Sequence, residues 1–398
     1  MSLNADLVID NKVVKKHYPS SNMDDQLVFT FEADPNLCLL KNKIAIHFVI
    51  ELDEKYFPEN GFAAKQFSSC SVELNSQRVS NNKTKGEYFL NDWLIKYGNF
   101  SPDYVETLFL EGFFDKYDDY ALSANNKAAI VGHRREGIPK KGSKYVYEMI
   151  MNPNDPFLNE NHPLPPGIEL KLFFDRLPVE FSVIKTGADD PLKGKVLELK
   201  DVYAQVEYIS SPSLRNLFDQ VDLKPLDYQY DECTVICRSL PLNEQYIRLE
   251  NLKGGNIPDY LFFALVKTES LNGSTSNSAF EFKNNGLKEV NLTLNGNSCL
   301  GFPVRIQNDT PIWPYYKFLD TLGRIHNVGN SRQWGLDIFK EKVLFSHKFE
   351  GEESNQGWLG ITLSLSEPLS SQHTLILWTV HNVKTTIDKY CMIEKYNL

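Results

Sequence analysis

The residues of this sequence with the greatest chemical potential are its eight histidines, its six cysteines and one basic cluster. No two histidines have the H-x-x-x-H or H-E-x-x-H spacing that places two imidazoles on one helix face for zinc. His373 and His381 flank one expected strand and stand too far apart to share a metal ion directly. The sequence also lacks the G-x-S-x-G turn that exposes a nucleophilic serine. We therefore expect no catalytic residue, no metal ligand and no cofactor, and we predict that the protein is not an enzyme.

Three further patterns have a chemical and a simpler interpretation. Residues 137–144 (GIPKKGSK) are rich in glycine and lysine, but they lack the Gly-Lys-Ser/Thr order of a phosphate-binding loop. The acidic pairs at residues 118–119 and 189–190 are sequence neighbours, which is typical of solvated turns. Four tryptophans of the C-terminal half are candidates for a sugar-stacking platform, but such residues more often anchor a core or an interface: Trp313, Trp334, Trp358 and Trp378.

The basic cluster combines His133, Arg134 and Arg135 with Lys140 and Lys141, and Lys144 follows it. A solvated loop is its simplest interpretation. Two functional alternatives remain open, namely a contact with an acidic neighbouring subunit and a contact with nucleic acid. If the cluster lies in a surface loop, replacing Arg134 and Arg135 by glutamate should leave the fold intact. The net charge of −10 argues against bulk nucleic-acid binding, because such binding depends on neutralising phosphates.

Length and composition predict two globular domains in a soluble, intracellular protein. The 398 residues exceed one ordinary core, and 42% of them are hydrophobic. No apolar run near the N-terminus has the character of a secretory signal, and no run has the length of a membrane span. Because nothing indicates an oxidising compartment, we expect all six cysteines to be free thiols: Cys38, Cys70, Cys233, Cys237, Cys299 and Cys391.

Apolar runs of strand length recur along the whole chain, which predicts an all-β protein. Residues 361–366 (ITLSLS) alternate with a period of two, as expected for a strand with one buried and one wet face. Aromatic residues make up 12% of the chain, and they suit pleated, half-buried surfaces. Helical spacing is limited to two short segments, residues 86–97 and 315–323.

The two halves of the sequence repeat one plan. Residues 44–50 and 72–76 (IAIHFVI, VELNS) are matched by residues 261–266 and 292–296 (LFFALV, LTLNG). Further on, the Gly-Ile-x-Leu-x-Leu strand at residue 167 is matched by the one at residue 360. After each comes a Leu/Pro corner and another strand, at residues 181–184 in the first half and 374–378 in the second. Matches in the same order indicate duplicated domains.

About eight strands per half predict two tandem eight-stranded jelly-roll β-sandwiches with short helices in their loops. We place an N-terminal arm at residues 1–25, the first jelly roll at 26–210, a linker at 211–227 and the second jelly roll at 228–398. The first half is longer between its matched strands, and we expect an insertion at residues 118–143. As an excursion from the jelly roll, this insertion should lie on the surface, away from both sheets.

The order of these patterns resembles the double jelly-roll major capsid proteins of Polinton (Maverick) elements and adintoviruses, relatives of the adenovirus and tailless-phage capsid lineage. The resemblance covers residues 26–389 and is clearest in SVELNSQRVSNN…YFLNDWLIKYG, LELKDVYAQVEYI and PDYLFFALVKTESLNGSTSNSAFEFKNNGLKEVNLTLNGNSCLGFP. The chain is shorter than most members. It also has Asn277-Ser-Ala-Phe where the family pattern has Asn-Pro-Phe.

The resemblance implies a structural capsid protein of the virion, made in the cytoplasm and assembled there or in the nucleus. Its implied partners are two further copies of itself in a pseudo-hexameric homotrimer, neighbouring capsomers and a single jelly-roll penton protein. It implies no strong nucleic-acid binding and no membrane span. Two alternatives stay open: a transposon-derived capsid protein adopted by a host for a binding role, and a tandem β-sandwich carbohydrate-active protein.

Overall fold

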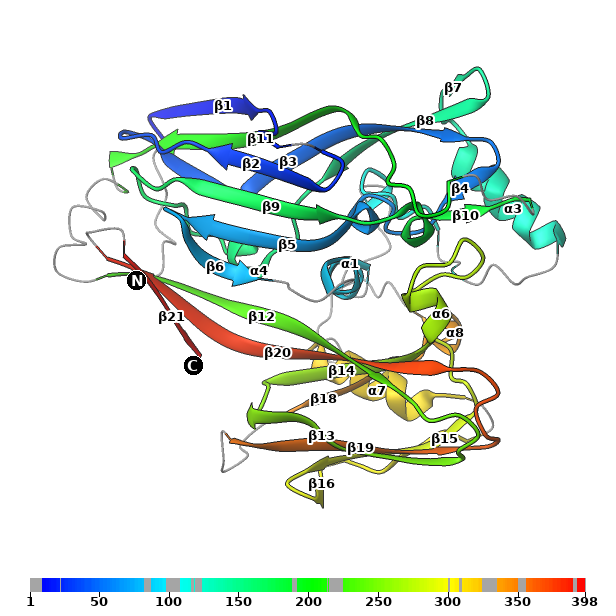
Figure 1. Ribbon diagram of the computed structural model, residues 1–398. Coiled ribbons are helices and arrows are strands. Elements are labelled where there is room, and N and C mark those ends of the chain that lie inside the picture. The colour runs from blue at the N-terminus through cyan, green and yellow to red at the C-terminus, as the bar shows by residue number, and fades with distance from the viewer. Residues whose placement is uncertain are drawn as a thin grey trace.

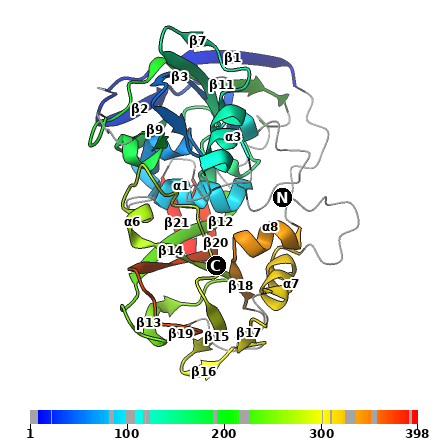
Figure 2. The ribbon, with the colours of Figure 1, turned by 90° about the vertical axis from the view of Figure 1, so that its right-hand side faces the viewer.

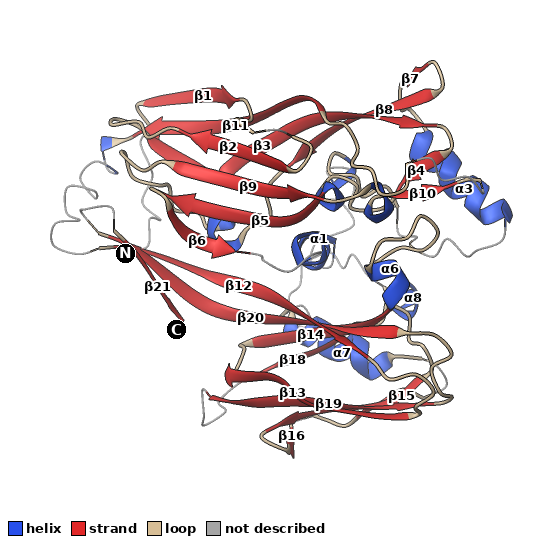
Figure 3. Cartoon of the chain, viewed as in Figure 1, coloured by secondary structure: helices blue, strands red, loops and turns tan. Residues whose placement is uncertain are grey.

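The computed structural model describes residues 9–21, 23–81, 87–97, 108–115, 118, 124–187, 192–212, 214, 225–299, 301–307, 310–323, 335–349, 356–388 and 392–397. They form two β-sandwiches, one from each half of the chain, which lie one above the other in Figure 1. Helices are short and lie in the connections between strands (Figure 3). This arrangement confirms the predicted all-β class with short helices in loops.

The first sandwich is built from two antiparallel sheets and a small extra strand pair. One sheet has the order β1-β11-β3-β8-β7, the other has the order β2-β9-β5-β6, and β10 pairs with β4. The bounds are β1 (Asn11–His17), β2 (Gln26–Phe31), β3 (Cys38–Asp53), β4 (Tyr56–Pro58), β5 (Phe67–Leu74), β6 (Gln77–Asn81), β7 (Lys140–Lys141), β8 (Lys144–Met151), β9 (Leu170–Arg176), β10 (Val183–Lys185) and β11 (Lys200–Ser210).

The second sandwich has one sheet of order β12-β20-β14-β18, with β21 added to β20. Its other sheet has the order β13-β19-β15-β16, with β17 added to β15. The bounds are β12 (Leu226–Ser239), β13 (Tyr246–Asn256), β14 (Tyr260–Lys267), β15 (Leu287–Leu294), β16 (Asn297–Ser298), β17 (Val304–Arg305), β18 (Phe345–Lys348), β19 (Gln356–Leu365), β20 (His373–Ile387) and β21 (Ile393–Asn397).

Both sandwiches have the jelly-roll strand order. Counting the main strands along each half, the first, eighth, third and sixth form one sheet and the second, seventh, fourth and fifth form the other. In the first half these strands are β1, β2, β3, β5, β6, β8, β9 and β11, and in the second half β12, β13, β14, β15, β17, β18, β19 and β20. Two sandwiches with the same eight-strand order confirm the predicted double jelly roll.

Alternation in the sequence explains why these segments pair as sheets. In β19 the side chains of Ile361, Leu363 and Leu365 are buried, while those of Thr362 and Ser364 are only half-buried. A strand whose alternate residues are apolar buries one face against the opposite sheet. The predicted strand at residues 361–366 is therefore confirmed, and one continuous apolar core extends through both sandwiches.

The described helices lie in the connections between strands. The predicted helix at residues 86–97 is α1 (Glu87–Asp92) followed by the π-helical segment η2 (Trp93–Tyr97), and the one at 315–323 is α7 (Ile312–Thr321). The other helices of the described residues are η1 (Ala64–Gln66), α3 (Ala124–Arg135), α4 (Pro156–Asn159), η4 (Val179–Phe181), α6 (Thr268–Leu271) and α8 (Leu336–Glu341). Figure 2 shows α1 between the two sandwiches and α7 and α8 on one flank of the second.

Three expectations from the sequence need correction. The expected N-terminal arm contains β1, which pairs along its whole length with β11 and is the first strand of the first jelly roll. Residues 181–184 are not the counterpart of β20, because β10 pairs with β4 in the small extra sheet. The true counterpart is β11, since each of these strands pairs with the first strand of its own sandwich.

The third correction concerns the insertion expected at residues 118–143, part of which lies outside the described residues. Its described part is not separate from the sheets. Ile130 of α3 is buried against Phe57 and Ile184, on β4 and β10. β7 pairs with β8 of the first sandwich. The segment therefore contributes a packed helix and a short strand to the first half.

Candidate functional site: the junction of the two sandwiches

Helix α1 of the first sandwich binds the outermost strand of the second. β12 is an edge strand, so its outer main-chain groups have no partner strand. The Glu87 carboxylate accepts a hydrogen bond from the main-chain N–H of Val235 at 3.0 Å. The Asn91 amide donates to the main-chain oxygen of Cys233 at 3.1 Å, and the Cys233 thiol donates back to Asn91 Oδ1 at 3.3 Å. Side chains of α1 thus take the place of a further strand.

Aromatic side chains fill the space behind these hydrogen bonds. Trp93 is fully buried and stacks on Trp378 of β20, with ring centroids 6.5 Å apart. Its ring also meets Phe280 and Phe282 of the second sandwich at 5.7 and 4.7 Å. The Trp378 indole N–H donates to the main-chain oxygen of Leu90 at 3.3 Å. Burial of such large rings is the main apolar contribution at the junction.

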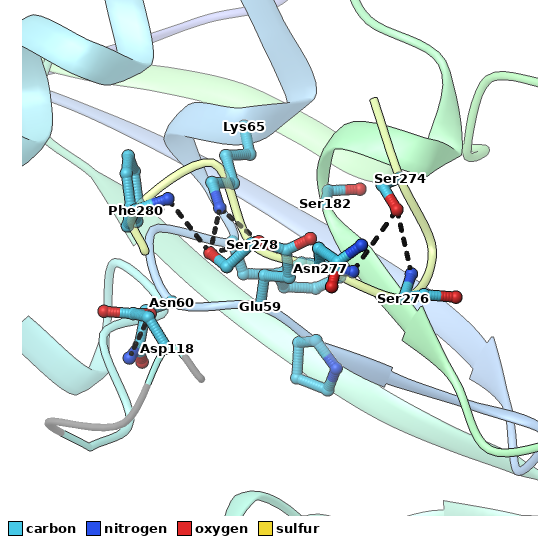
Figure 4. A network of polar contacts seen from close by, with 12 residues as sticks. Glu59, Asn60, Lys65, Asp118, Ser182, Ser274, Ser276, Asn277, Ser278 and Phe280 are labelled. Atoms are coloured by element: carbon cyan, nitrogen blue, oxygen red, sulfur yellow. Dashed lines mark hydrogen bonds and ion pairs between the residues drawn. The ribbon is translucent and has the colours of Figure 1, made fainter. Parts of the chain in front are cut away.

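A polar network crosses the junction beside these rings (Figure 4). Lys65, from the connection between β4 and β5, pairs with Glu59, and its ammonium lies 3.8 Å from the centre of the Phe280 ring. The Ser278 hydroxyl of the second sandwich donates to the Glu59 carboxylate at 2.8 Å. Ser278 belongs to the segment in which the sequence departs from the Asn-Pro-Phe pattern, and here it joins the two sandwiches.

The charges of this network are almost completely removed from water. Lys65 is 0% exposed and Glu59 is 1% exposed. Burial raises the pKa of Glu59 and lowers that of Lys65, while the attraction between the two groups opposes both shifts. A second ion pair links Lys342, just after α8, to Asp118 of the first half. Asp118 also accepts a hydrogen bond from the Asn60 amide at 3.0 Å.

At the junction the main chain of the first sandwich also lies very close to a side chain of the second. Gly61 has a φ of +72°, and a Cβ atom there would lie 2.9 Å from Cε2 of Phe280. Any larger residue would be strained at this φ and would displace either the loop or the Phe280 ring. Ion pairs, aromatic packing and this close approach together hold the two sandwiches in one relative position. This geometry couples the two sandwiches mechanically.

The basic cluster divides into one buried residue and several exposed ones. Arg134 is 0% exposed: its guanidinium binds both carboxylate oxygens of Asp115 at 2.8 Å and donates to the main-chain oxygen of Pro58 at 2.8 Å. It therefore cannot serve as the surface contact expected for it. Its neighbour Arg135 is half-buried over the Tyr145 ring, 4.7 Å from its centre.

The other members remain on the surface near α3 and β7. The side chain of His133 is 59% exposed and that of Lys141 is 80% exposed. Lys140 pairs with Glu54 at 2.8 Å. The sequence could have predicted the burial of Arg134. Ile130 lies four residues earlier, so in a helix the two residues share the apolar face of α3.

Other chemistry is limited within the described residues. Five of the six cysteines are described there, and no disulfide joins any two of them; Cys391 lies outside them. Burial raises the pKa of Cys237 to about 11, so that thiol stays protonated. Across the described ranges, no three His, Cys, Asp or Glu side chains gather as metal ligands would. None of the helices described is long and apolar enough to cross a membrane.

Comparison with known proteins adds to this geometry. No family model matches the sequence. An uncharacterized Caenorhabditis elegans protein, F54H12.2, is 26% identical over 155 residues, which cover 38% of this chain and 37% of the worm protein. The match therefore spans little more than a third of either protein.

Solved structures match over nearly the whole length. The mavirus major capsid protein has a TM-score of 0.58 at 11% identity, covering 96% of this chain and 90% of that one. The chain has a double jelly-roll fold. A chain of the Sputnik virophage gives 0.62 at 10% identity, covering 98% of this double jelly roll and 89% of that chain. The Faustovirus major capsid protein gives 0.53 at 9%, covering 100% and 92%.

Proposed function

We propose that this double jelly-roll chain is a structural major capsid protein that forms trimeric, pseudo-hexameric capsomers of an icosahedral shell. The observation that carries the proposal is the likeness to the mavirus major capsid protein, which extends over 96% of this chain and 90% of that one. Both sandwiches and their junction are thus included. A fixed junction suits a shell subunit, because such a subunit must hold its contact surfaces in a constant relative geometry.

The proposed partners follow from this role. Each chain carries two similar but not identical sandwiches. Three chains would therefore place six sandwiches around one three-fold axis. Neighbouring capsomers and a single jelly-roll penton protein complete the proposed set, and the virion is the proposed location.

Light scattering on the purified chain tests the proposal. We expect a particle of three times the 45.7 kDa chain mass, and electron microscopy should show pseudo-hexagonal capsomers. Co-expression with a penton protein encoded beside it should then yield closed shells. A strict monomer at micromolar concentration would contradict the proposal. It would favour a binding role for a single chain instead.

A further inference from the structure

The corresponding sheets of the two sandwiches are covered very unequally. In the second sandwich Val235, Trp378 and Phe262 lie side by side across β12, β20 and β14, and each is at most 5% exposed. Trp378 faces the first sandwich through its contacts with α1 and Trp93. This outer face of the sheet is therefore buried inside the chain.

The matching face of the first sandwich has no such cover among the described residues. Val14 of β1 is 49% exposed and Ile150 of β8 is 37% exposed. Figure 1 shows β1 and β11 on the side of the first sandwich that faces away from the second, and Figure 2 agrees. Single exposed apolar residues are normal on protein surfaces, so these two become a candidate contact only through the comparison with the covered sheet of the second sandwich.

Aromatic groups and charged groups of both signs complete this open face: Glu207 lies opposite Val14 and pairs with Lys12, and Glu148 hydrogen-bonds to His47. The Tyr203 ring of β11 stacks on His47 with centroids 4.6 Å apart, and the Lys16 ammonium lies 4.1 Å from its centre. Tyr18, which is 69% exposed, lies 6.5 Å from the same ring. Tyrosine is enriched in protein–protein interfaces, whereas lysine is depleted there, so the tyrosines are the side chains that we expect at the centre of an interface on this face.

The outer edge of β1 is open as well. β1 and β12 both end their sheets and both pair with the last strand of their sandwich. Glu87 and Asn91 of α1 bind the outer main-chain groups of β12. In the described part of the chain no helix binds β1 in this way. An open edge strand offers main-chain donors and acceptors to a partner.

The second sandwich carries a helix at the same point of the strand order as α1 in the first, although α7 packs on β18 whereas α1 packs on β5 and β12. α1 follows β6 and α7 follows β17, and β6 and β17 are the fifth main strands of their sandwiches. One side of α7 is buried, where Phe318 packs on Phe262. The other side exposes three adjacent apolar residues, Ile312, Trp313 and Tyr316, at 58%, 61% and 46%.

We propose that this exposed face of α7 docks on β1 and β11 of a second copy of the chain. The contact would repeat between chains what α1 does to β12 and β20 within a chain. It is head-to-tail, because α7 and β1–β11 are different surfaces, and such contacts close into a ring when the rotation permits. The inference rests on the proposed trimer and specifies its interface: three copies bury all three α7 faces and all three β1 edges.

Charge introduced on either surface tests the interface. Trp313→Glu and Val14→Glu should each raise the dissociation constant of the trimer by at least roughly 30-fold, as expected for a central interface residue. Both side chains are exposed, so far-UV circular dichroism should not change. Leu242→Glu is the matched control, because Leu242 is 45% exposed in the turn between β12 and β13. This variant should remain trimeric.

Photo-crosslinking tests the docking site directly and does not depend on the glutamate variants folding. With Trp313→benzoylphenylalanine, irradiation of the trimer should link position 313 to peptides of β1 or β11 in another chain. Crosslinks to other peptides would overturn the interface, and so would a folded, fully trimeric Trp313→Glu variant. Either result leaves the capsid proposal intact. A monomeric wild-type chain would overturn both.

Discussion

Replacing Arg134 by methionine should destabilise the first sandwich by about 3–5 kcal/mol. Methionine keeps much of the buried volume but removes the charge. Asp115, whose side chain is 7% exposed, then loses the bidentate pair at 2.8 Å. The main-chain oxygen of Pro58 loses its guanidinium donor in the same step. Loss of one partner of a buried ion pair costs this much because the other charge stays buried without compensation.

Urea unfolding followed by tryptophan fluorescence measures the effect as a change in the free energy of unfolding. Lys141→Met and His133→Met are matched controls within the same cluster, and each should stay within about 0.5 kcal/mol of wild type because both side chains are exposed. Adding Asp115→Asn to Arg134→Met should recover part of the loss. A folded Arg134→Met protein within 0.5 kcal/mol of wild type would refute the assignment of Arg134 to the interior.

Three further predictions concern the buried groups. Burial raises the pKa of Asp155 to about 6, so the folded state holds this proton more tightly than the unfolded chain; acidification from pH 7 to 4.5 should therefore stabilise the wild type by about 2 kcal/mol more than Asp155→Asn, as measured by urea unfolding at both pH values. Lys65→Met should lower the melting temperature strongly, and the double variant with Glu59→Leu should recover most of the loss; equal melting temperatures for both variants would contradict the buried pair. Alkylation of the unfolded chain without reductant should give six adducts by mass spectrometry, and two or more missing adducts would reject free thiols throughout.

The repeated strand patterns were sufficient to predict the architecture. The matched pairs at residues 44 and 261, 72 and 292, and 167 and 360 are β3 and β14, β5 and β15, and β9 and β19, which occupy the same positions in their sheets. Each of these strands is long and buried on a regular face, so its sequence carries the pattern by itself. The alternation of apolar and polar residues along a strand is the feature of a β-fold that is easiest to predict from a single sequence.

Strand identity was predicted wrongly where it depends on a distant partner. The segment at residues 181–184 is as apolar as the last strand of a sandwich, but it pairs with three residues of β4. β1 reads Asn-Lys-Val-Val-Lys-Lys-His, and its lysines resemble those of a solvated arm. Lysine is also common on edge strands, where it discourages pairing with other chains. Composition alone cannot separate these two cases.

The sequence around the junction residues carries little sign of their role. Glu59 and Lys65 lie on one short connection, while their partner Ser278 is more than two hundred residues away. Nothing local distinguishes this buried ion pair from a solvated one. Arg134 shows the opposite case, because the spacing from Ile130 in an Ala-rich segment indicates a helix with a buried side.

In both sandwiches the first strand pairs with the last, and this pairing constrains how the chain folds as it leaves the ribosome. β1 cannot pair with β11 until β11 has been synthesised, and β12 cannot pair with β20 until β20 has been synthesised. The first sandwich can therefore close while the second is still being synthesised. During that interval Trp93 has no Trp378 to cover it, and α1 presents an aromatic surface that other nascent chains could occupy. Slow translation of the second half, or loss of its last strands, should thus increase aggregation of a first half that is itself correctly folded.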